Sequence, residues 1–329
     1  MLSEFDLIKK YFVRARPVRA ALGIGDDCAL LAPSPGMQLA ISSDMLVEGR
    51  HFLPGADPRK LGHKCLAVNL SDLAAMGAKP VAFTLALALP ASDERWLEPF
   101  AQGLFELADQ YDCELIGGDT TKGPLTINIT VFGELAPGHA LRRAAARPGD
   151  DVWISGTLGD ARLALAGYWG EQRLSAADQE AAAVRMHEPQ PRVALGMALA
   201  SGEGAVEGAT LARAALDISD GLVGDIAHIL KASGVGATLD VDALPAGPVL
   251  ARQPLALRRE FTAAGGDDYE LCFTAPRAHR EAVLEAARRT GTPVTRVGTI
   301  DAAPGLRWTD AAGAPLALAL AGFDHFSAG

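Results

Sequence analysis

Four short acidic segments, far apart in the chain, each follow or close an apolar run that has the pattern of a β-strand. They comprise residues 23–27, 42–44, 117–120 and 217–221. Loops held at strand ends by a rigid scaffold commonly carry functional side chains, so we expect the fold to place these carboxylates on such loops. Carboxylates that are brought together repel one another unless a cation lies between them, and hard oxygen ligands suit Mg²⁺ or Ca²⁺. The segments therefore predict a Mg²⁺-dependent phosphoryl-transfer site.

The length and charge of the chain limit its class. At 329 residues it exceeds what one compact core of ordinary size holds, so we expect two domains. Apolar residues make up 49% of the chain and charged residues 21%, which is typical of a soluble globular protein. The formal net charge of −10 disfavours nucleic acid or an anionic membrane as a partner, because both require basic patches. A phosphorylated small molecule stays compatible, since bound Mg²⁺ can supply positive charge.

The cysteines and the N-terminal segment favour a cytoplasmic protein. No two cysteines form a C-x-x-C pair, so zinc and redox motifs are absent. Thiols in a reducing compartment are expected at Cys28, Cys65, Cys113 and Cys272. Residues 1–6 carry acids instead of the cationic region of a signal peptide. The longest strongly apolar run, 81–89, is far shorter than a membrane span.

Strand and helix patterns are mixed along the whole chain without strict βαβ regularity, which predicts an α+β fold. Strands are expected at 28–31, 38–42, 81–89, 114–116, 125–134, 152–155, 214–218, 269–274 and 295–300. Helices are expected at 4–12, 58–76, 93–111, 160–168, 176–186, 222–231 and 277–289. The proline, glycine and arginine residues of 137–150 indicate a linker between an N-terminal domain, 1–136, and a C-terminal α+β domain, 151–329.

Two familiar nucleotide-binding motifs are missing. Gly23-Ile24-Gly25 is followed by two aspartates instead of the third glycine of a dinucleotide fingerprint, and no G-x-x-x-x-G-K-[ST] sequence occurs. No Ser-His-Asp or Cys-His constellation is evident either. An ATP site in this chain would therefore depend on metal bridges and on loops of another kind.

Taken singly, the acidic residues also have ordinary structural interpretations. An aspartate after a glycine is more often a turn or a helix cap than a ligand. This applies to Asp26, Asp27, Asp44, Asp119 and Asp220. Asp72 lies in an otherwise apolar helical segment, where a metal or hydrogen bonds would serve as its partner, and Asn69 is three residues earlier on the same face. Arg143 has the guanidinium fork that binds phosphate and is equally consistent with a solvated linker arginine.

Six motifs in a fixed order are more specific than any one residue. They are Gly-Ile-Gly-Asp-Asp-Cys-Ala (23–29), Ile-Ser-Ser-Asp (41–44), Asn-Leu-Ser-Asp-Leu-Ala-Ala-Met-Gly (69–77), Leu-Ile-Gly-Gly-Asp-Thr-Thr (115–121), Asp-Ile-Ser-Asp-Gly-Leu (217–222) and Gly-Gly-Asp-Asp-Tyr-Glu-Leu (265–271). The series resembles the signatures of the thiamine-monophosphate kinase family, in the superfamily typified by aminoimidazole ribonucleotide synthetase, and the likeness covers essentially the whole chain. It implies an N-terminal domain that binds ATP and Mg²⁺ and pairs with a second copy in a homodimer.

The activity implied by the resemblance is transfer of the ATP γ-phosphoryl group to thiamine monophosphate, giving thiamine diphosphate by direct in-line transfer. The acceptor phosphate is already ionised at neutral pH, so no strong general base is needed and no catalytic side chain is expected. The obstacle is the approach of two polyanions, which metal ions remove by bridging and neutralising oxygens. This accounts for the predominance of acids in the motifs.

The matching motif positions imply the site residues. Mg²⁺ would be held by oxygens of Asp27, Ser42, Ser43, Asp44, Asp72, Asp119, Asp217 and Asp220. ATP would contact Gly118, Asp119, Arg143, Ser219 and Tyr111, although Tyr111 also fits a core tyrosine. Thiamine monophosphate would contact His51, Asp267 and Phe323, since an aromatic face and a carboxylate both favour a cationic thiazolium. These three also fit a loop histidine, a turn aspartate and a core phenylalanine. Asp267 stands where the family more often has glutamate, so its reach is one methylene shorter.

Three other functions stay compatible with the residues. Another ATP-dependent synthetase of the superfamily would share the fold; a selenophosphate synthetase would want a reactive cysteine near the N-terminus, and residues 1–20 contain none. A Mg²⁺-dependent phosphohydrolase would release orthophosphate without an acceptor. A non-catalytic cation- or nucleotide-binding module would bind ATP without turnover.

Overall fold

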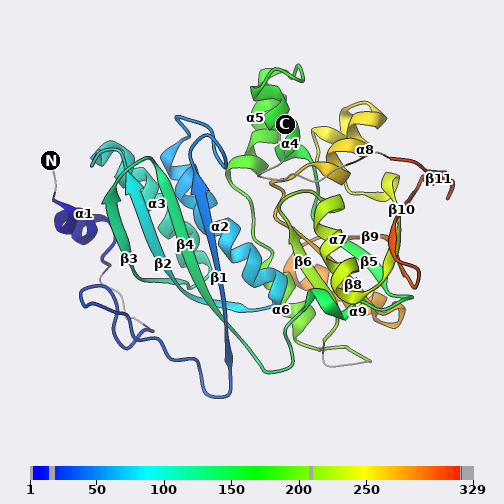
Figure 1. Ribbon diagram of the computed structural model, residues 1–329, viewed down its shortest axis with the longest axis horizontal. Coiled ribbons are helices and arrows are strands. Elements are labelled where there is room, and N and C mark those ends of the chain that lie inside the picture. Colours follow the sequence, from blue (N-terminus) through cyan, green and yellow to red (C-terminus); the bar gives the residue numbers. More distant parts are fainter. Residues whose placement is uncertain (1–2, 15–18, 207–209, 319, 321–329) are drawn as a thin grey trace. The chain divides into compact units, whose positions relative to one another are not determined.

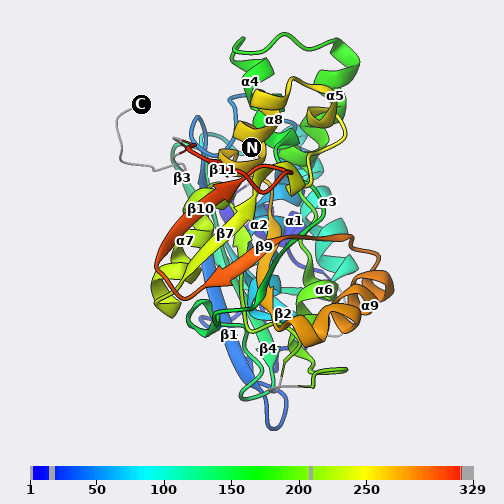
Figure 2. The ribbon, with the colours of Figure 1, turned by 90° about the vertical axis from the view of Figure 1, so that its right-hand side faces the viewer.

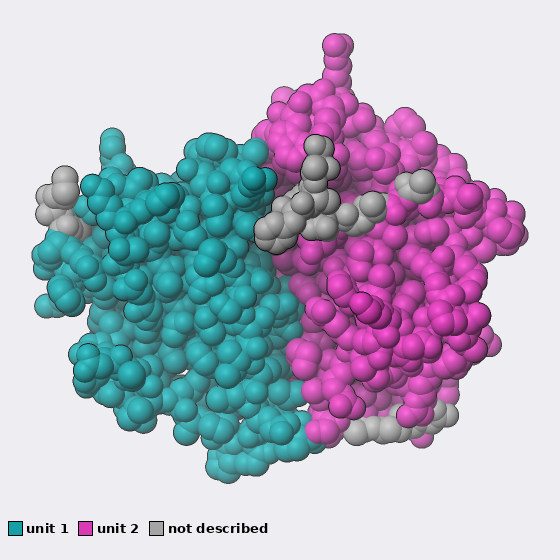
Figure 3. All heavy atoms as spheres, viewed as in Figure 1, with its two compact units in different colours: residues 1–73, 78–137 teal, residues 74–77, 138–329 magenta. Residues whose placement is uncertain are grey.

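The structure is a computed structural model that describes residues 3–14, 19–206, 210–318 and 320. Phe323, which is predicted to contact the substrate, lies outside the described residues. The chain divides into two compact units, which Figure 3 shows in different colours. Unit 1 comprises residues 1–73 and 78–137, and unit 2 comprises residues 74–77 and 138–329.

Unit 1 contains a four-stranded sheet with the order β1-β4-β2-β3. Strands β1 (Gln38–Val47), β4 (Thr126–Leu135) and β2 (Lys79–Leu89) are antiparallel neighbours, and β3 (Glu114–Lys122) runs parallel to β2. The unit also contains α1 (Glu4–Tyr11), most of α2 (Pro58–Met76) and α3 (Glu94–Gln110). Helix α2 begins where expected, because the Asp57 side chain accepts the N–H of Arg59 at 2.9 Å and Pro58 occupies the first helical position.

The two faces of this sheet differ in burial. Along β4, buried Ile127, Ile129 and Val131 alternate with half-buried Thr126, Asn128 and Thr130, as the sequence predicts. Helices α2 and α3 lie on one side of the sheet (Figure 1). A Cβ at Gly133 of β4 would lie 2.9 Å from the Leu73 side chain of α2, so this helix packs directly on the sheet. On β1, Ile41 and Met45 are 61% and 55% exposed.

Unit 2 contains a seven-stranded sheet with the order β11-β10-β7-β9-β5-β8-β6. Its strands are β5 (Asp151–Ser155), β6 (Ala214–Ile218), β7 (Gly236–Asp240), β8 (Glu270–Ala275), β9 (Val294–Asp301), β10 (Gly305–Thr309) and β11 (Pro315–Leu316). Strands β7 and β10 are parallel and the other neighbours are antiparallel. Figure 2 shows β10, β7 and β9 side by side.

Helices and short 3₁₀ turns separate most of these strands along the chain. They are α4 (Asp160–Tyr168), α5 (Ala176–His187), α6 (Val193–Ala200), α7 (Leu222–Ser233), α8 (Leu255–Ala264) and α9 (Arg280–Thr290), with short 3₁₀ turns η1 (Arg143–Ala145), η2 (Val241–Ala243), η3 (Leu250–Arg252) and η4 (Arg277–His279). Val152 and Ile154 of β5 share a buried cluster with Ile226 of α7. Trp153, which points to the other face because strands alternate, stacks on Phe273 of β8 with ring centroids 6.3 Å apart.

The α+β fold is confirmed, and so are most of the expected elements. Residues 28–31 form no strand; Leu30 makes only an isolated bridge with Leu22. Helices α6 and α8 and strands β7, β10 and β11 were not predicted. These elements are short, and α6 is apolar on nearly every side, so it has no helical period to detect. In the part of the chain that the structure describes, no helix combines the length and apolar character needed to cross a membrane.

Candidate active site

Two of the four acidic segments lie inside strands, so the prediction that they form loops at strand ends is wrong. Ser42, Ser43 and Asp44 lie in the middle of β1, and Asp119 lies in β3, which continues to Lys122. Both are edge strands of the unit 1 sheet, where polar side chains and glycine are tolerated because one backbone edge is open. Of the other two segments, 217–221 leaves β6 after Ile218 as expected, whereas 23–27 lies in an irregular region with isolated bridges and, in the described part of the chain, no adjoining strand.

Helix α2 and strand β1 bring three of the predicted Mg²⁺ ligands onto neighbouring elements. The Ser42 hydroxyl donates a short hydrogen bond to the Asp72 carboxylate. The main-chain N–H of Asp44 donates to Asn69 Oδ1 at 3.0 Å, and Asn69, which is fully buried, donates to the carbonyl of Cys65 at 2.9 Å. Asn69 therefore connects α2 to β1, and Asp72 has a hydroxyl partner on β1. The Ser42 hydroxyl is thus one hydrogen-bond partner of the Asp72 carboxylate, as expected for an acid in an apolar helical segment.

Asp119 and Ser43 occupy different positions from this group. In the strand register, Asp44 is level with Ile129, whereas Asp119 is level with Ala86 and Asn128, one row along. Asp119 is exposed, and β4 and β2 lie between its strand and β1. The Ser43 hydroxyl lies 3.0 Å from Thr130 Oγ1 on β4. Within unit 1, Asp119 is thus separate from Asp44 and Asp72.

Gly118 has a packing reason to be glycine. Its φ is +154°, and a Cβ at this position would lie 1.8 Å from the carbonyl oxygen of Leu85 on β2. The family resemblance implies that ATP contacts this glycine. Close pairing of β3 with β2 already accounts for it without a ligand.

The remaining predicted residues of unit 1 come from three different segments. Asp27 is exposed in the loop that precedes β1. His51 follows β1, and its Nδ1 accepts the N–H of Val47 at 3.0 Å, so a neutral His51 carries its proton on Nε2. Tyr111 ends α3 and is half-buried; its N–H donates to Leu107 O at 3.3 Å.

In unit 2, the turn after β6 is organised by a buried carboxylate that sequence reasoning missed. Asp225, in the first turn of α7, accepts the main-chain N–H groups of Ser219 and Asp220, both at 3.1 Å. Asp225 is 6% exposed; burial, and secondly the charge of Asp220, raise the pKa of Asp225 to about 7. The positive charge of Arg143 acts in the opposite direction, which places this arginine within electrostatic range of the turn. The sequence did contain a signal for Asp225, because it is an acid next to Leu222 and Ile226 on the apolar face of a helix.

The segment 265–269 packs directly on that turn. The N–H of Asp267 donates to Ser219 O at 2.7 Å and the N–H of Tyr269 donates to Ile218 O at 2.8 Å. A Cβ at Gly266 would lie 2.6 Å from Ser219 O, so the approach requires glycine. Asp267 and Tyr269 have φ of 71° and 51°, a left-handed conformation that costs roughly 1–2 kcal/mol per residue and recurs at functional sites. The two acidic motifs of unit 2 therefore form one assembly that holds Asp217, Ser219, Asp220 and Asp267.

Two buried carboxylates, in or next to this segment, bind groups on other parts of unit 2. Asp268 is 1% exposed and accepts the N–H of Gly159 at 2.9 Å; burial raises the pKa of Asp268 well above its ordinary range. Glu270 is fully buried and accepts from Ser155 Oγ at 2.6 Å, Arg185 Nη2 at 2.6 Å and Arg192 Nε at 2.7 Å. Two guanidinium groups thus compensate one buried charge.

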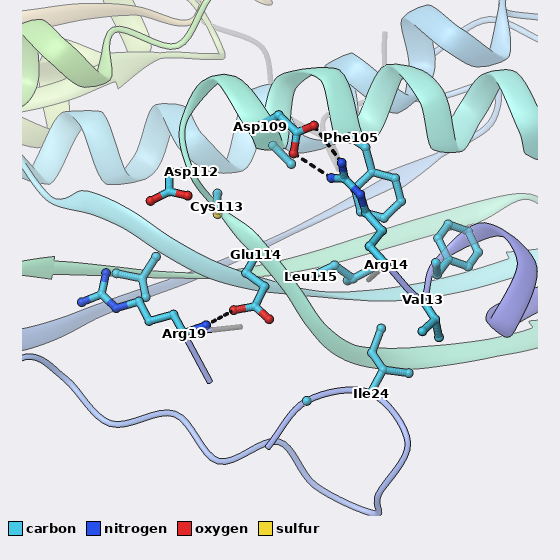
Figure 4. Close-up of a pocket in the computed structure, with 14 residues that line it drawn as sticks. Val13, Arg14, Arg19, Ile24, Phe105, Asp109, Asp112, Cys113, Glu114 and Leu115 are labelled. Carbon is cyan, nitrogen blue, oxygen red and sulfur yellow. Dashed lines mark hydrogen bonds and ion pairs between the residues drawn. The ribbon is translucent and has the colours of Figure 1, made fainter. Parts of the chain in front are cut away.

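A pocket of about 230 Å³ lies at the N-terminal end of β3 (Figure 4). Its residues include none of the predicted site residues. Arg14 in its wall donates to both carboxylate oxygens of Asp109, at 2.7 and 2.9 Å, and Glu114 Oε2 accepts the N–H of Arg19 at 2.8 Å. Glu114 Oε1 is buried with no hydrogen-bond partner among the described residues, but none of these groups belongs to the candidate site.

The predicted Mg²⁺ ligands are divided between the units. Asp27, Ser42, Ser43, Asp44, Asp72 and Asp119 belong to unit 1, and Asp217 and Asp220 belong to unit 2. Among residues 3–14, 19–206, 210–318 and 320, no three His, Cys, Asp or Glu side chains form a group that could hold a metal ion. The convergence of these aspartates on one site stays a prediction.

Comparison with known proteins decides the family. The family model for the N-terminal domain of AIR synthase related proteins matches residues 25–135, and the model for their C-terminal domain matches residues 147–310. The thiamine-monophosphate kinase of Salmonella typhimurium is 46% identical over 331 residues, which cover 98% of each chain. The chain belongs to the thiamine-monophosphate kinase family. A second member, from Haemophilus influenzae, is 39% identical over 335 residues, covering 99% of this chain and 98% of the other.

Solved structures of the thiamine-monophosphate kinase family agree with this fold. The enzyme from Stenotrophomonas maltophilia K279a superposes with a TM-score of 0.82 at 44% identity, covering 91% of this chain and 92% of the other. The complex of AaThiL with AMPPCP and TMP has a TM-score of 0.75 at 28% identity, covering 90% and 89% of the two chains. Hydrogenase maturation protein HypE, at 22% identity and a TM-score of 0.72, shares the fold.

Proposed function

We propose that this protein is a kinase that uses ATP to phosphorylate thiamine monophosphate, giving thiamine diphosphate. The observation that carries the proposal is the 46% identity to a thiamine-monophosphate kinase over 98% of both chains. The AaThiL complex, whose ligands AMPPCP and TMP correspond to the two substrates, supports the same reaction. The acceptor oxygen is already ionised, so the protein has to position two polyanions and offset their charge; it need not remove a proton.

The predicted metal ligands suit Mg²⁺ in their chemistry. All of them are carboxylate or hydroxyl oxygens, which hard divalent cations prefer, and Ser42, Asp44 and Asp72 lie on adjoining elements in unit 1. We assign Mg²⁺ to Asp27, Ser42, Ser43, Asp44, Asp72, Asp119, Asp217 and Asp220. When bound, Mg²⁺ offsets the charge of the phosphate oxygens during transfer.

The protein's own groups bind and orient the substrates. We assign the nucleotide to Tyr111, Gly118, Asp119, Arg143 and Ser219. Asp225 holds the N–H groups of Ser219 and Asp220, so it orients the turn that carries them. Thiamine monophosphate is assigned to His51, Asp267 and Phe323. The His51 ring is oriented by the hydrogen bond that its Nδ1 accepts from Val47, and the Asp267 carboxylate attracts the cationic thiazolium.

We also propose a role for each domain, a homodimer and a cytoplasmic location. Residues 1–136 form the ATP- and Mg²⁺-binding domain, 137–150 the linker and 151–329 the C-terminal domain. Residues 1–136 also form the homodimer interface, supported by the exposed Ile41 and Met45 on the sheet of unit 1. Ile41→Lys with Met45→Lys is expected to halve the mass measured by sedimentation velocity. The cytoplasm is the proposed compartment, since the four cysteines are free thiols.

One assay tests the activity. The purified protein is incubated with ATP and Mg²⁺ and with thiamine monophosphate, thiamine or no acceptor, and ADP and thiamine diphosphate are measured. Equal amounts of the two products, only with the monophosphate, are expected. ADP formation that is indifferent to the monophosphate would indicate a phosphohydrolase, and ATP binding without turnover would indicate a binding module. Consumption of a different acceptor would indicate another synthetase of the superfamily.

A further inference from the structure

Arg185 of α5 makes two hydrogen bonds with one nitrogen. Its Nη2 donates to Glu270 Oε1 at 2.6 Å and to the main-chain carbonyl oxygen of Asp268 at 3.1 Å. The Arg185 side chain is 16% exposed, so both bonds are formed largely away from water. The first bond compensates the buried Glu270 charge. The second contributes nothing to that compensation, because it goes to the main chain of the turn.

The carbonyl of Asp268 and the N–H of Tyr269 belong to the same peptide group. Arg185 holds the oxygen of that group, and Ile218 O accepts its N–H at 2.8 Å. The orientation of a peptide plane is set by ψ of the residue before it and φ of the residue after it, and here φ of Tyr269 is 51°. Relaxation of Tyr269 to an ordinary φ would turn this plane and break both bonds. Arg185 therefore holds a conformation that a tyrosine does not adopt on its own.

The same peptide adjoins the residue assigned to the substrate. Asp267, with φ of 71°, is separated from Tyr269 only by Asp268, whose side chain is anchored to the N–H of Gly159. The 268–269 peptide is thus one residue away from Asp267 in the same left-handed turn. We propose that Arg185 is a positioning residue: it fixes the 268–269 peptide, and with it the left-handed turn that presents Asp267 to the cationic ring of thiamine monophosphate. This inference rests on the proposed function.

Arg192 provides a matched control within the same network. It is 14% exposed, and it donates to Glu270 at 2.7 Å through Nε and 2.5 Å through Nη2. Its third bond goes to the side chain of Gln190 at 3.4 Å. Loss of either arginine removes one of two guanidinium groups from Glu270. Loss of Arg185 also removes the hydrogen bond to the Asp268 carbonyl.

The test compares Arg185→Met with Arg192→Met in the full-length protein. We measure kcat, KM for thiamine monophosphate, KM for ATP and Tm. For Arg185→Met we expect KM for thiamine monophosphate to rise about tenfold, with KM for ATP and kcat within about threefold of wild type. Arg192→Met should lower Tm to a similar degree and leave KM for thiamine monophosphate within about threefold. Arg185→Lys, which can still donate to the carbonyl, should restore most of the affinity.

Two results would overturn the proposal. One is an unchanged KM for thiamine monophosphate in Arg185→Met; the other is an equal rise in both methionine variants, which would make the network merely structural. Should Arg185→Met not fold, the comparison uses Arg185→Gln and Arg192→Gln, where we expect KM for thiamine monophosphate to rise about fivefold for Arg185→Gln and less than about threefold for Arg192→Gln. Amide hydrogen exchange of residues 265–271 is measured as well, and we expect faster exchange only in the Arg185 variants.

The exchange measurement separates this proposal from the proposed function. If wild-type protein does not phosphorylate thiamine monophosphate, the function fails, and exchange still reports whether Arg185 holds the turn. If wild type is active but exchange and KM are both unchanged in the Arg185 variants, the positioning role fails alone.

Discussion

The main-chain N–H of Asp267 donates a 2.7 Å hydrogen bond to the carbonyl oxygen of Ser219. This bond joins two motifs that are far apart in the chain: the segment 217–221, assigned to Mg²⁺ and ATP, and the segment 265–271, assigned to the acceptor. A second bond, from the N–H of Tyr269 to Ile218 O, runs beside it. Displacement of one segment therefore displaces the other, so with the assignments proposed above we expect changes at these contacts to alter substrate geometry as well as stability.

Substitution of Gly266 by alanine is expected to separate these segments. Its Cβ would lie 2.6 Å from Ser219 O, a main-chain atom that cannot move aside without shifting the turn. We expect Gly266→Ala to destabilise the fold by about 1–3 kcal/mol and to lower kcat/KM for thiamine monophosphate. Gly123→Ala is the control, because its Cβ would meet Ala88 at an ordinary 3.5 Å. Urea unfolding and steady-state kinetics measure both effects; equal behaviour of the two variants would contradict the prediction.

Gly117 and Gly118 are neighbours in β3, and of the two only Gly118 lacks room for a Cβ atom. A Cβ at Gly118 would lie 1.8 Å from Leu85 O, whereas a Cβ at Gly117 would approach nothing closer than Thr84 Cγ2 at 3.9 Å. We expect Gly118→Ala to lower the free energy of unfolding by about 3 kcal/mol or more, and Gly117→Ala to change it by less than about 1 kcal/mol. The measurement is denaturant unfolding without ligands, so nucleotide binding does not contribute. A stable Gly118→Ala variant would restore the nucleotide as the reason for this glycine.

Asp225 is expected to make stability depend on pH. Its folded-state pKa of about 7 lies above the ordinary aspartate pKa of 3.8, which serves for the unfolded chain. The folded state then binds the proton more tightly, so stability falls as pH rises from about 4 to about 7 and is level above that. The contribution is at most about 4 kcal/mol. Asp225→Asn should remove it.

The measurement is chemical unfolding of wild type and Asp225→Asn at several pH values with EDTA, since a bound cation would favour the charged carboxylate. The stability of the variant relative to wild type should increase with pH across this window. A difference that does not change with pH would show that Asp225 does not titrate there.

Asp119 is exposed on an edge strand, so we expect its substitution to affect activity without affecting the stability of the fold. Asp119→Asn is expected to lower kcat by about 100-fold or more at fixed Mg²⁺, with a change in unfolding free energy within about 0.5 kcal/mol. Glu98→Gln, an exposed acid on α3, is the charge-matched control and should be fully active. A titration of activity with Mg²⁺ after treatment with EDTA completes the test. Near-normal turnover in Asp119→Asn would remove this residue from the metal site.

In unit 2, the position of the acidic segment 217–221 could be predicted from the sequence. Asp217 and Ser219 were placed correctly at the end of a strand, because Ala214–Ile218 is a continuous apolar run followed by an aspartate-glycine turn. Asp225 and Arg185 were missed. Each lies in a helix whose pattern is explained by packing, and only the folded chain shows that Asp225 bonds to Ser219 and Arg185 to the carbonyl of Asp268.

The amino-acid order alone was sufficient for the α+β class and the family, because periodicity and motif order are properties of local sequence. Strand pairing decided the rest. It showed that Ser42–Asp44 and Asp119 lie within edge strands, that Gly118 accommodates Leu85 O, and that Asp267 and Tyr269 are held in left-handed conformations. These outcomes depend on which distant backbone atoms come within hydrogen-bonding distance, and that information exists only once the sheets have formed.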